Sequence, residues 1–146
     1  MPLIDYWDIE EEIVEILREG LPGSTVTSEE EQMFSPEQVP WLCVYLERRD
    51  APPSQPIAGG SRLRYQVRYS IWCWHYSLDK RESMKLRDQL IGNAEVVLLS
   101  NRTLNDKVEQ AWLEGGRLLN GLGTEQQDFL SGGEIVLIAE VVSSTD

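Results

Sequence analysis

The chain has 146 residues, 25 of them acidic and 13 basic, and its formal net charge is −12. This length suits a single domain whose hydrophobic core needs no metal or disulfide for stability. Such acidity argues against specific nucleic-acid binding, because phosphate contacts require clustered Lys and Arg side chains. We expect no membrane partner, because the sequence has neither a secretory signal nor an apolar run of roughly 20 residues. Two cysteines are too few for a disulfide framework, so we expect free thiols.

The charge is unevenly spread along the chain. Residues 1–50 hold 13 acidic and 3 basic side chains, residues 51–100 hold 4 and 7, and residues 101–146 hold 8 and 3. A solvated acidic surface with chance clustering explains this distribution. A subunit whose acidic third meets the basic third of a neighbouring copy explains it as well.

The N-terminal third predicts one helix and two strands. Asp5 is a suitable N-cap, and Gly20 and Pro22 end the helix. The apolar positions of this helix recur at helical spacing, at Tyr6, Ile9, Ile13, Ile16 and Leu17. A brief edge strand is expected around Val26. The apolar run 41–46 is rich in aromatic and β-branched residues and predicts a buried strand.

A projecting loop is expected at about 49–61, because prolines and glycines prevent either neighbouring strand from continuing through it. Connections of about a dozen residues without secondary structure are frequently functional. The loop therefore becomes a candidate contact with a partner.

A long strand is predicted from Arg62 to Tyr76, where the pattern has a period of two. One face is apolar throughout, with Leu63, Tyr65, Val67, Tyr69, Ile71 and Cys73. The other face begins with basic and polar side chains and ends with aromatic ones: Arg62, Arg64, Gln66, Arg68, Ser70, Trp72, Trp74 and Tyr76. Contact with water alone does not explain this change of character.

A second helix is predicted from Asp79 to Leu99, with Asp79 and Glu82 as an acidic capping box. Four cations lie in its N-terminal half, at Lys80, Arg81, Lys85 and Arg87. Exposed cations there oppose the helix dipole by about 0.3–1 kcal/mol each. We interpret them as positions that meet a carboxylate outside the helix.

The remaining residues predict a break at 101–103 and a strand at 108–114 that ends at Gly115–Gly116 and resumes at 117–119. A single helical turn from Thr124 to Leu130 follows, and Gly132–Gly133 form a turn before a strand at 134–142. Residues 1–146 thus form one α+β domain, with a mainly antiparallel sheet of four to five strands and two helices packed on one face. The expected element order is α-β-β-(β)-α-β-β.

No motif indicates catalysis, a cofactor site or a metal site, so we expect a protein that is not an enzyme. His75 is the only histidine and shares a strand face with Cys73. Their Cα atoms would lie about 6.5–7 Å apart, too far for a nucleophile and its base, so packing is the better interpretation. The sequence has no second histidine for a metal and no phosphate-binding glycine loop.

The sequence resembles the tail-terminator and tail-completion proteins of long-tailed bacteriophages. The resemblance lies in the helix 9–17 ending at Gly20, the segment 39–46 with proline before an aromatic and aliphatic strand, the long strand 64–72, the helix 79–99 and the final strand 134–142. It covers nearly the whole chain in element order and size. It implies a structural virion protein that forms a ring, usually of six subunits, ends the tail tube and docks to the head–neck connector.

The resemblance also implies partners and a location. The partners would be further copies of the chain, the tail-tube protein and the head–tail connector proteins, with DNA passing through the lumen without specific binding. The protein would be assembled in the host cytoplasm and reside in the tail or neck of the virion. The candidate subunit interface comprises Arg62, Arg64, Arg68, Lys85 and Arg87 with Glu11, Glu12 and Glu15. The candidate tube or neck contact comprises Asp50, Pro52, Pro53, Gln55, Pro56 and Ile57 of the loop.

Two alternatives remain open at the level of sequence. The chain is another neck or tail-tube component; self-assembly into open-ended tubes would favour a tube protein, and closed rings a terminator. Or it is a small α+β ligand-binding domain or enzyme with a pocket lined by Trp72, Trp74 and Trp112.

Overall fold

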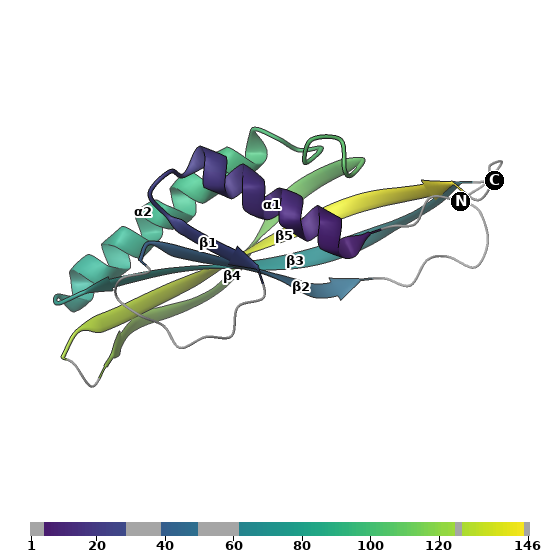
Figure 1. Ribbon diagram of the computed structural model, residues 1–146. Helices are drawn as coiled ribbons and strands as arrows, with labels where there is room; N and C mark the ends of the chain where they lie inside the picture. The colour runs from purple at the N-terminus through teal and green to yellow at the C-terminus, as the bar shows by residue number, and fades with distance from the viewer. Residues whose placement is uncertain (1–4, 29–38, 50–61, 125–126, 145–146) are drawn as a thin grey trace.

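The computed structural model describes residues 5–28, 39–49, 62–124 and 127–144 (Figure 1). Their secondary structure runs α1 (Tyr6–Gly20), β1 (Thr25–Ser28), β2 (Trp41–Arg49), β3 (Arg62–Ser77), α2 (Lys80–Leu99), β4 (Gln110–Gly123) and β5 (Phe129–Ser144). The α+β class and the predicted element order are confirmed, and the optional early strand is present as β1.

The five strands form one sheet in the order β1-β2-β3-β5-β4. β2 pairs antiparallel with β3, β3 with β5 along its full length, and β5 with β4. The sheet is thus mainly antiparallel, as predicted, and the exception is β1, which pairs parallel with β2. The long connection 29–40 permits this, because a parallel pair needs a crossover of about a dozen residues.

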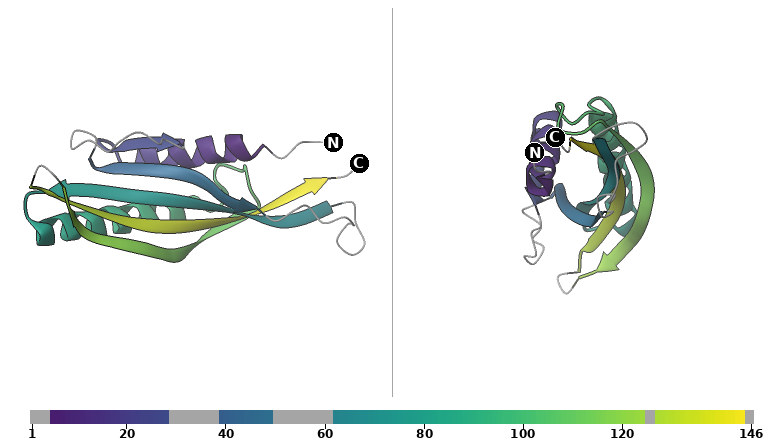
Figure 2. Two further views of the ribbon diagram at one scale, coloured as in Figure 1. Left: turned by 90° about the horizontal axis from the view of Figure 1, so that it is seen from below. Right: turned by 90° about the vertical axis from the view of Figure 1, so that its right-hand side faces the viewer.

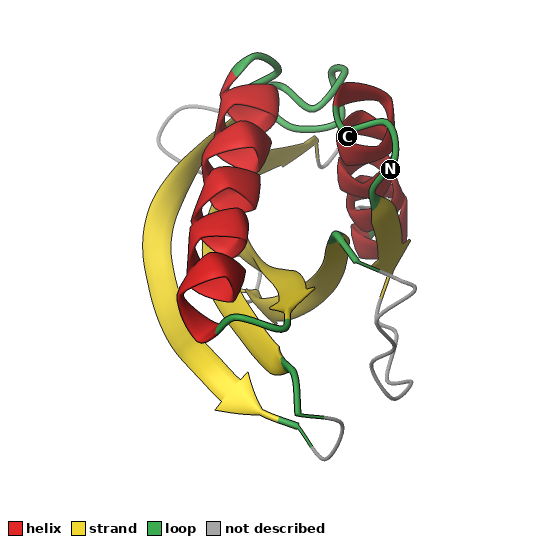
Figure 3. Cartoon of the chain, turned by 90° about the vertical axis from the view of Figure 1, so that its left-hand side faces the viewer, coloured by secondary structure: helices red, strands yellow, loops and turns green. Residues whose placement is uncertain are grey.

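Both helices lie on the inner side of the curved sheet (Figures 2 and 3). α1 covers β1 and β2, whereas α2 packs on β3, β5 and β4. The core forms between these layers and includes Ile13 and Leu17 of α1, Ala94 of α2, and Val67 and Ile71 of β3. Neither described helix lies on the opposite face, which we call the helix-free face.

The two helices begin where the sequence predicts. Asp5 accepts a hydrogen bond from the backbone N–H of Asp8, at 3.0 Å. Asp79 accepts from the N–H groups of Arg81 and Glu82. These carboxylates satisfy donors that the first turn of a helix leaves unpaired.

The glycine pairs in the C-terminal third do not form turns. Gly115–Gly116 lie within β4, where the pairing with β5 shifts register between Gly115 and Leu118, and Gly132–Gly133 lie within β5. Gly132 meets a requirement for space, because a Cβ there would overlap the ring of Trp74. The predicted helical turn from Thr124 to Leu130 is also wrong, since β5 begins at Phe129.

Candidate interaction surface

The helix-free face of the sheet carries the side chains of the long strand β3 that change from basic to aromatic along its length. Because successive residues of a strand point to opposite faces, Arg64, Gln66 and Arg68 of β3 lie on this face. Cross-strand pairing places Glu140 of β5 next to Gln66 on the same face. One end of the face is therefore basic and polar, and the other end, around Trp72, is aromatic.

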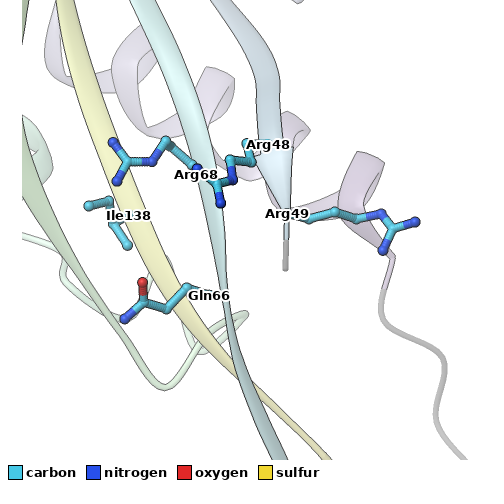
Figure 4. A pocket seen from close by; sticks show the side chains of 5 residues that line it. All are labelled: Arg48, Arg49, Gln66, Arg68 and Ile138. Atoms are coloured by element: carbon cyan, nitrogen blue, oxygen red, sulfur yellow. The ribbon is translucent and has the colours of Figure 1, made fainter. Parts of the chain in front are cut away.

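A small pocket lies at the basic end, lined by Arg48, Arg49, Gln66, Arg68 and Ile138 (Figure 4). Arg48 and Arg68 are direct partners across β2 and β3. Like charges at such positions repel and destabilise the pair. Arg49 points the other way, and its guanidinium carbon lies 5.4 Å from the centre of the Tyr6 ring on α1.

Sequence reasoning missed Arg48 and Gln66 as members of this site. The adjacent Arg48 and Arg49 at the end of a predicted strand are a visible signal. The register that puts Arg48 opposite Arg68 is not visible in the sequence, because a bulge between Leu46 and Arg48 shifts the pairing.

Two arginines of the candidate subunit interface already contact carboxylates of their own chain. Arg64 pairs with Glu140 at 3.0 Å, and Arg68 pairs with Glu114 at 3.2 Å. The Arg68–Glu114 pair is exposed on both sides, and such pairs contribute about 0–1 kcal/mol. Both pairs use Nη1 of the arginine, and the side chains of Arg64 and Arg68 remain 46% and 33% exposed.

The aromatic end of the face packs on itself. The rings of Trp72 and Trp74 stack with centroids 5.3 Å apart, and the guanidinium of Arg117 lies 5.6 Å from the Trp72 ring. Trp112 pairs with Ile138, four residues along β5 from the partner of Trp72, which is about 13 Å of strand. The structure thus does not bring the three tryptophans into one pocket.

Glu134 anchors the irregular part of β4. Its buried carboxylate accepts hydrogen bonds from the Ser70 hydroxyl and from the backbone N–H of Arg117, and it lies 3.5 Å from Nε of Arg117. Burial by itself raises the pKa of Glu134, but these hydrogen bonds and the charge of Arg117 outweigh it and lower the pKa. The ionised carboxylate therefore stabilises the edge of the sheet.

Arg87 does not belong to an interface between subunits, which corrects the prediction for this residue. It is 2% exposed and donates through Nη1 to the carbonyl oxygens of Leu119 and Gly132, at 3.1 and 2.8 Å. Its Nη2 donates to Asn120 and its Nε to Asp88. The hydrogen-bond acceptors for Arg87 thus come from β4 and β5 of the same chain, and not from a neighbouring subunit.

Lys85 is exposed and forms no ion pair with a described residue.

The acidic candidates lie on α1, on the other side of the sheet from the arginines. Glu11 accepts from the indole N–H of Trp7 at 2.7 Å, and Glu15 pairs with Arg18 at 3.0 Å. Glu12 accepts from the side-chain amide of Asn105. Trp7 is 51% exposed beside these carboxylates.

The remaining predicted interface residues lie at the start of β3 or in the preceding segment, residues 50–61. Arg62 begins β3 and pairs through its backbone with Ser144. The predicted loop contacts, at Asp50, Pro52, Pro53, Gln55, Pro56 and Ile57, lie outside the described residues.

Cys73 and His75 do not form a nucleophile and its base. Cys73 is fully buried in the core, and burial raises the pKa of its thiol to about 12, so the thiol stays protonated at neutral pH. The Nδ1 atom of His75 contacts the backbone of Tyr76.

The described ranges contain no cluster of three or more His, Cys, Asp or Glu side chains placed to hold a metal. Neither described helix is long and apolar enough to span a membrane.

Two solved structures align with this fold over most of its length. One belongs to the virion of a native gene transfer agent particle; it aligns over 92% of this chain and 94% of its own, with 12% identity and a TM-score of 0.47. A second solved structure aligns over 91% of this chain and 94% of its own, with 14% identity and a TM-score of 0.46. No family model matches the sequence, and no curated protein is similar to it.

Proposed function

We propose that this chain is a structural virion protein of a phage-like particle, a tail terminator that forms a ring, ends the tail tube and docks to the head–neck connector. The observation that carries the proposal is a pair of oppositely charged clusters on different sides of the sheet. Arg48, Arg64 and Arg68 gather on the helix-free face, where Glu114 and Glu140 pair with two of them. Exposed acids of α1, among them Glu11 and Glu15, lie in the helix layer (Figure 1).

Two different, oppositely charged patches on one subunit favour head-to-tail association. Such contacts generate a closed ring when the rotation between subunits closes, and an open filament when it does not. The element order supports a ring in particular, because it is the order that the resemblance to tail terminators implies. Six subunits are the expected number.

The mechanism in this proposal is geometric. A self-closing interface sets the size of the ring, and the two ends of the ring cap the tail-tube protein and the head–tail connector. DNA passes through the lumen without specific binding, since the net charge of −12 repels phosphate. The protein then resides in the tail or neck of the virion after assembly in the host cytoplasm.

Native mass spectrometry with negative-stain images of the purified protein tests this function. We expect a discrete oligomer and closed rings. Open-ended tubes would assign the chain to the tail tube instead. A monomer at all accessible concentrations, with a melting temperature that rises on addition of a small molecule, would overturn the proposal in favour of a ligand-binding domain.

A further inference from the structure

The pocket between β2, β3 and β5 is lined by arginines whose charge the described residues compensate only in part. Arg48 and Arg68 are cross-strand neighbours in β2 and β3, and among the described residues Arg48 has no ion-pair or hydrogen-bond partner. The carboxylate beside Arg68 belongs to Glu114, which is 49% exposed and so only weakly bound. Figure 4 shows Arg68 and Gln66 on either side of Ile138 and Arg48 beside the base of Arg68, while Arg49 points away.

This arrangement suits a carboxylate. Guanidinium groups bind carboxylates with directed, paired hydrogen bonds, and the amide of Gln66 adds a further donor. An anion between Arg48 and Arg68 would also remove the repulsion that their register imposes. Ile138 supplies an apolar floor beside the charges.

The outer face of α1 carries a matching set of groups. Trp7, Glu11 and Glu15 follow one another at intervals of four residues, so they lie along one side of the helix. Trp7 is 51% exposed, and its indole is fixed by the hydrogen bond to Glu11. Exposed tryptophans are typical anchors of protein interfaces, and an indole ring also accepts an arginine on its face.

The two sets cannot meet within one subunit, because α1 lies on the inner side of the sheet (Figure 3), whereas Arg48 and Arg68 lie on the helix-free face. The geometry points to a contact in which the Trp7–Glu11–Glu15 side of α1 in one copy covers the arginine pocket of a second copy. This inference rests on the proposed function, since it takes a further copy of the chain as the partner. Because the two patches differ, each subunit uses both, and the contact propagates from copy to copy.

Charge exchange tests the contact. The first variant carries Arg48→Glu and Arg68→Glu, and the second carries Glu11→Lys and Glu15→Lys. Each variant alone opposes like charges at every contact, so the concentration for half-maximal assembly should rise about tenfold or more. An equimolar mixture of the two variants alternates complementary contacts, and we expect it to assemble as the wild-type protein does. A control with Arg81→Glu and Arg102→Glu has the same charge change as the first variant and should assemble normally.

The outcomes separate this inference from the proposed function. Wild-type rings whose assembly neither variant changes would overturn the contact and leave the ring. Wild-type protein that stays monomeric would overturn the proposed function together with the contact. Salt-dependent binding of double-stranded DNA that only the first variant abolishes, with normal assembly, would assign the pocket to phosphate and refute the carboxylate partner. If a reversed variant melts early, Arg48→Gln with Arg68→Gln replaces it and should weaken assembly in the same direction.

Discussion

Replacing the buried Arg87 by Met should destabilise the fold. The Nη1 and Nη2 atoms of the guanidinium make three hydrogen bonds inside the chain, to Leu119, Gly132 and Asn120, at 2.8–3.1 Å. A fourth bond, from Nε, goes to the exposed Asp88 and is not counted here. Bonds from a charged donor contribute about 1.5–3 kcal/mol each, so the gross loss is about 5–9 kcal/mol. Removing a buried charge returns several kcal/mol of desolvation cost. The net loss is then about 2–4 kcal/mol, or about 6–13 °C in melting temperature for a chain of this size.

Thermal unfolding followed by tryptophan fluorescence measures this loss. Arg87→Lys keeps the charge but not the planar fork, so it should melt between wild type and Arg87→Met. Arg81→Met, on an exposed turn of the same helix, is the matched control and should change stability by less than about 0.5 kcal/mol. An Arg87→Met protein that melts within about 3 °C of wild type would refute the structural role given to this arginine.

Three further predictions concern the sheet and its core. Gly132→Ala should lower the free energy of unfolding, measured with urea, by about 1–3 kcal/mol, because the new Cβ overlaps the ring of Trp74. Gly92→Ala should raise the free energy of unfolding by about 0.5–1 kcal/mol, because Gly92 lies on the exposed side of α2 and its Cβ would meet no atom within 4 Å. Equal effects of the two changes would argue against the close contact. Cys73 should not react with a thiol reagent in the folded protein at neutral pH and should react once urea unfolds it; rapid native labelling would contradict its burial and its raised pKa. The lowered pKa of Glu134 adds stability that is fully present above about pH 4.5 and is lost as the pH falls through the folded pKa. Glu134→Gln should therefore differ most from wild type at neutral pH and converge with it in acid, and a difference that stays constant down to pH 3 would refute this linkage.

Local sequence patterns determined the elements whose stabilising contacts are local. Asp5 and Asp79 begin their helices because a carboxylate caps the first turn within two or three residues of itself. The period of two from Arg62 onward predicts β3, because alternation is a property of the strand alone. The element order and the fold class follow from these segments and their connections.

Only the tertiary structure decided what depends on contacts between distant segments. Gly132 looks like a turn residue in the sequence, yet it lies in β5. A glycine is needed at this position of the strand because the ring of Trp74 in β3 leaves no room for a Cβ. Arg87 looks like an unpaired surface cation, yet the carbonyl groups of two strands bind it inside the chain. Arg48 becomes part of the candidate interaction surface only through the bulge that aligns it with Arg68. The sequence by itself thus determined the helices, the strands and the uneven charge, whereas strand register decided which charges are buried and which remain available to a partner.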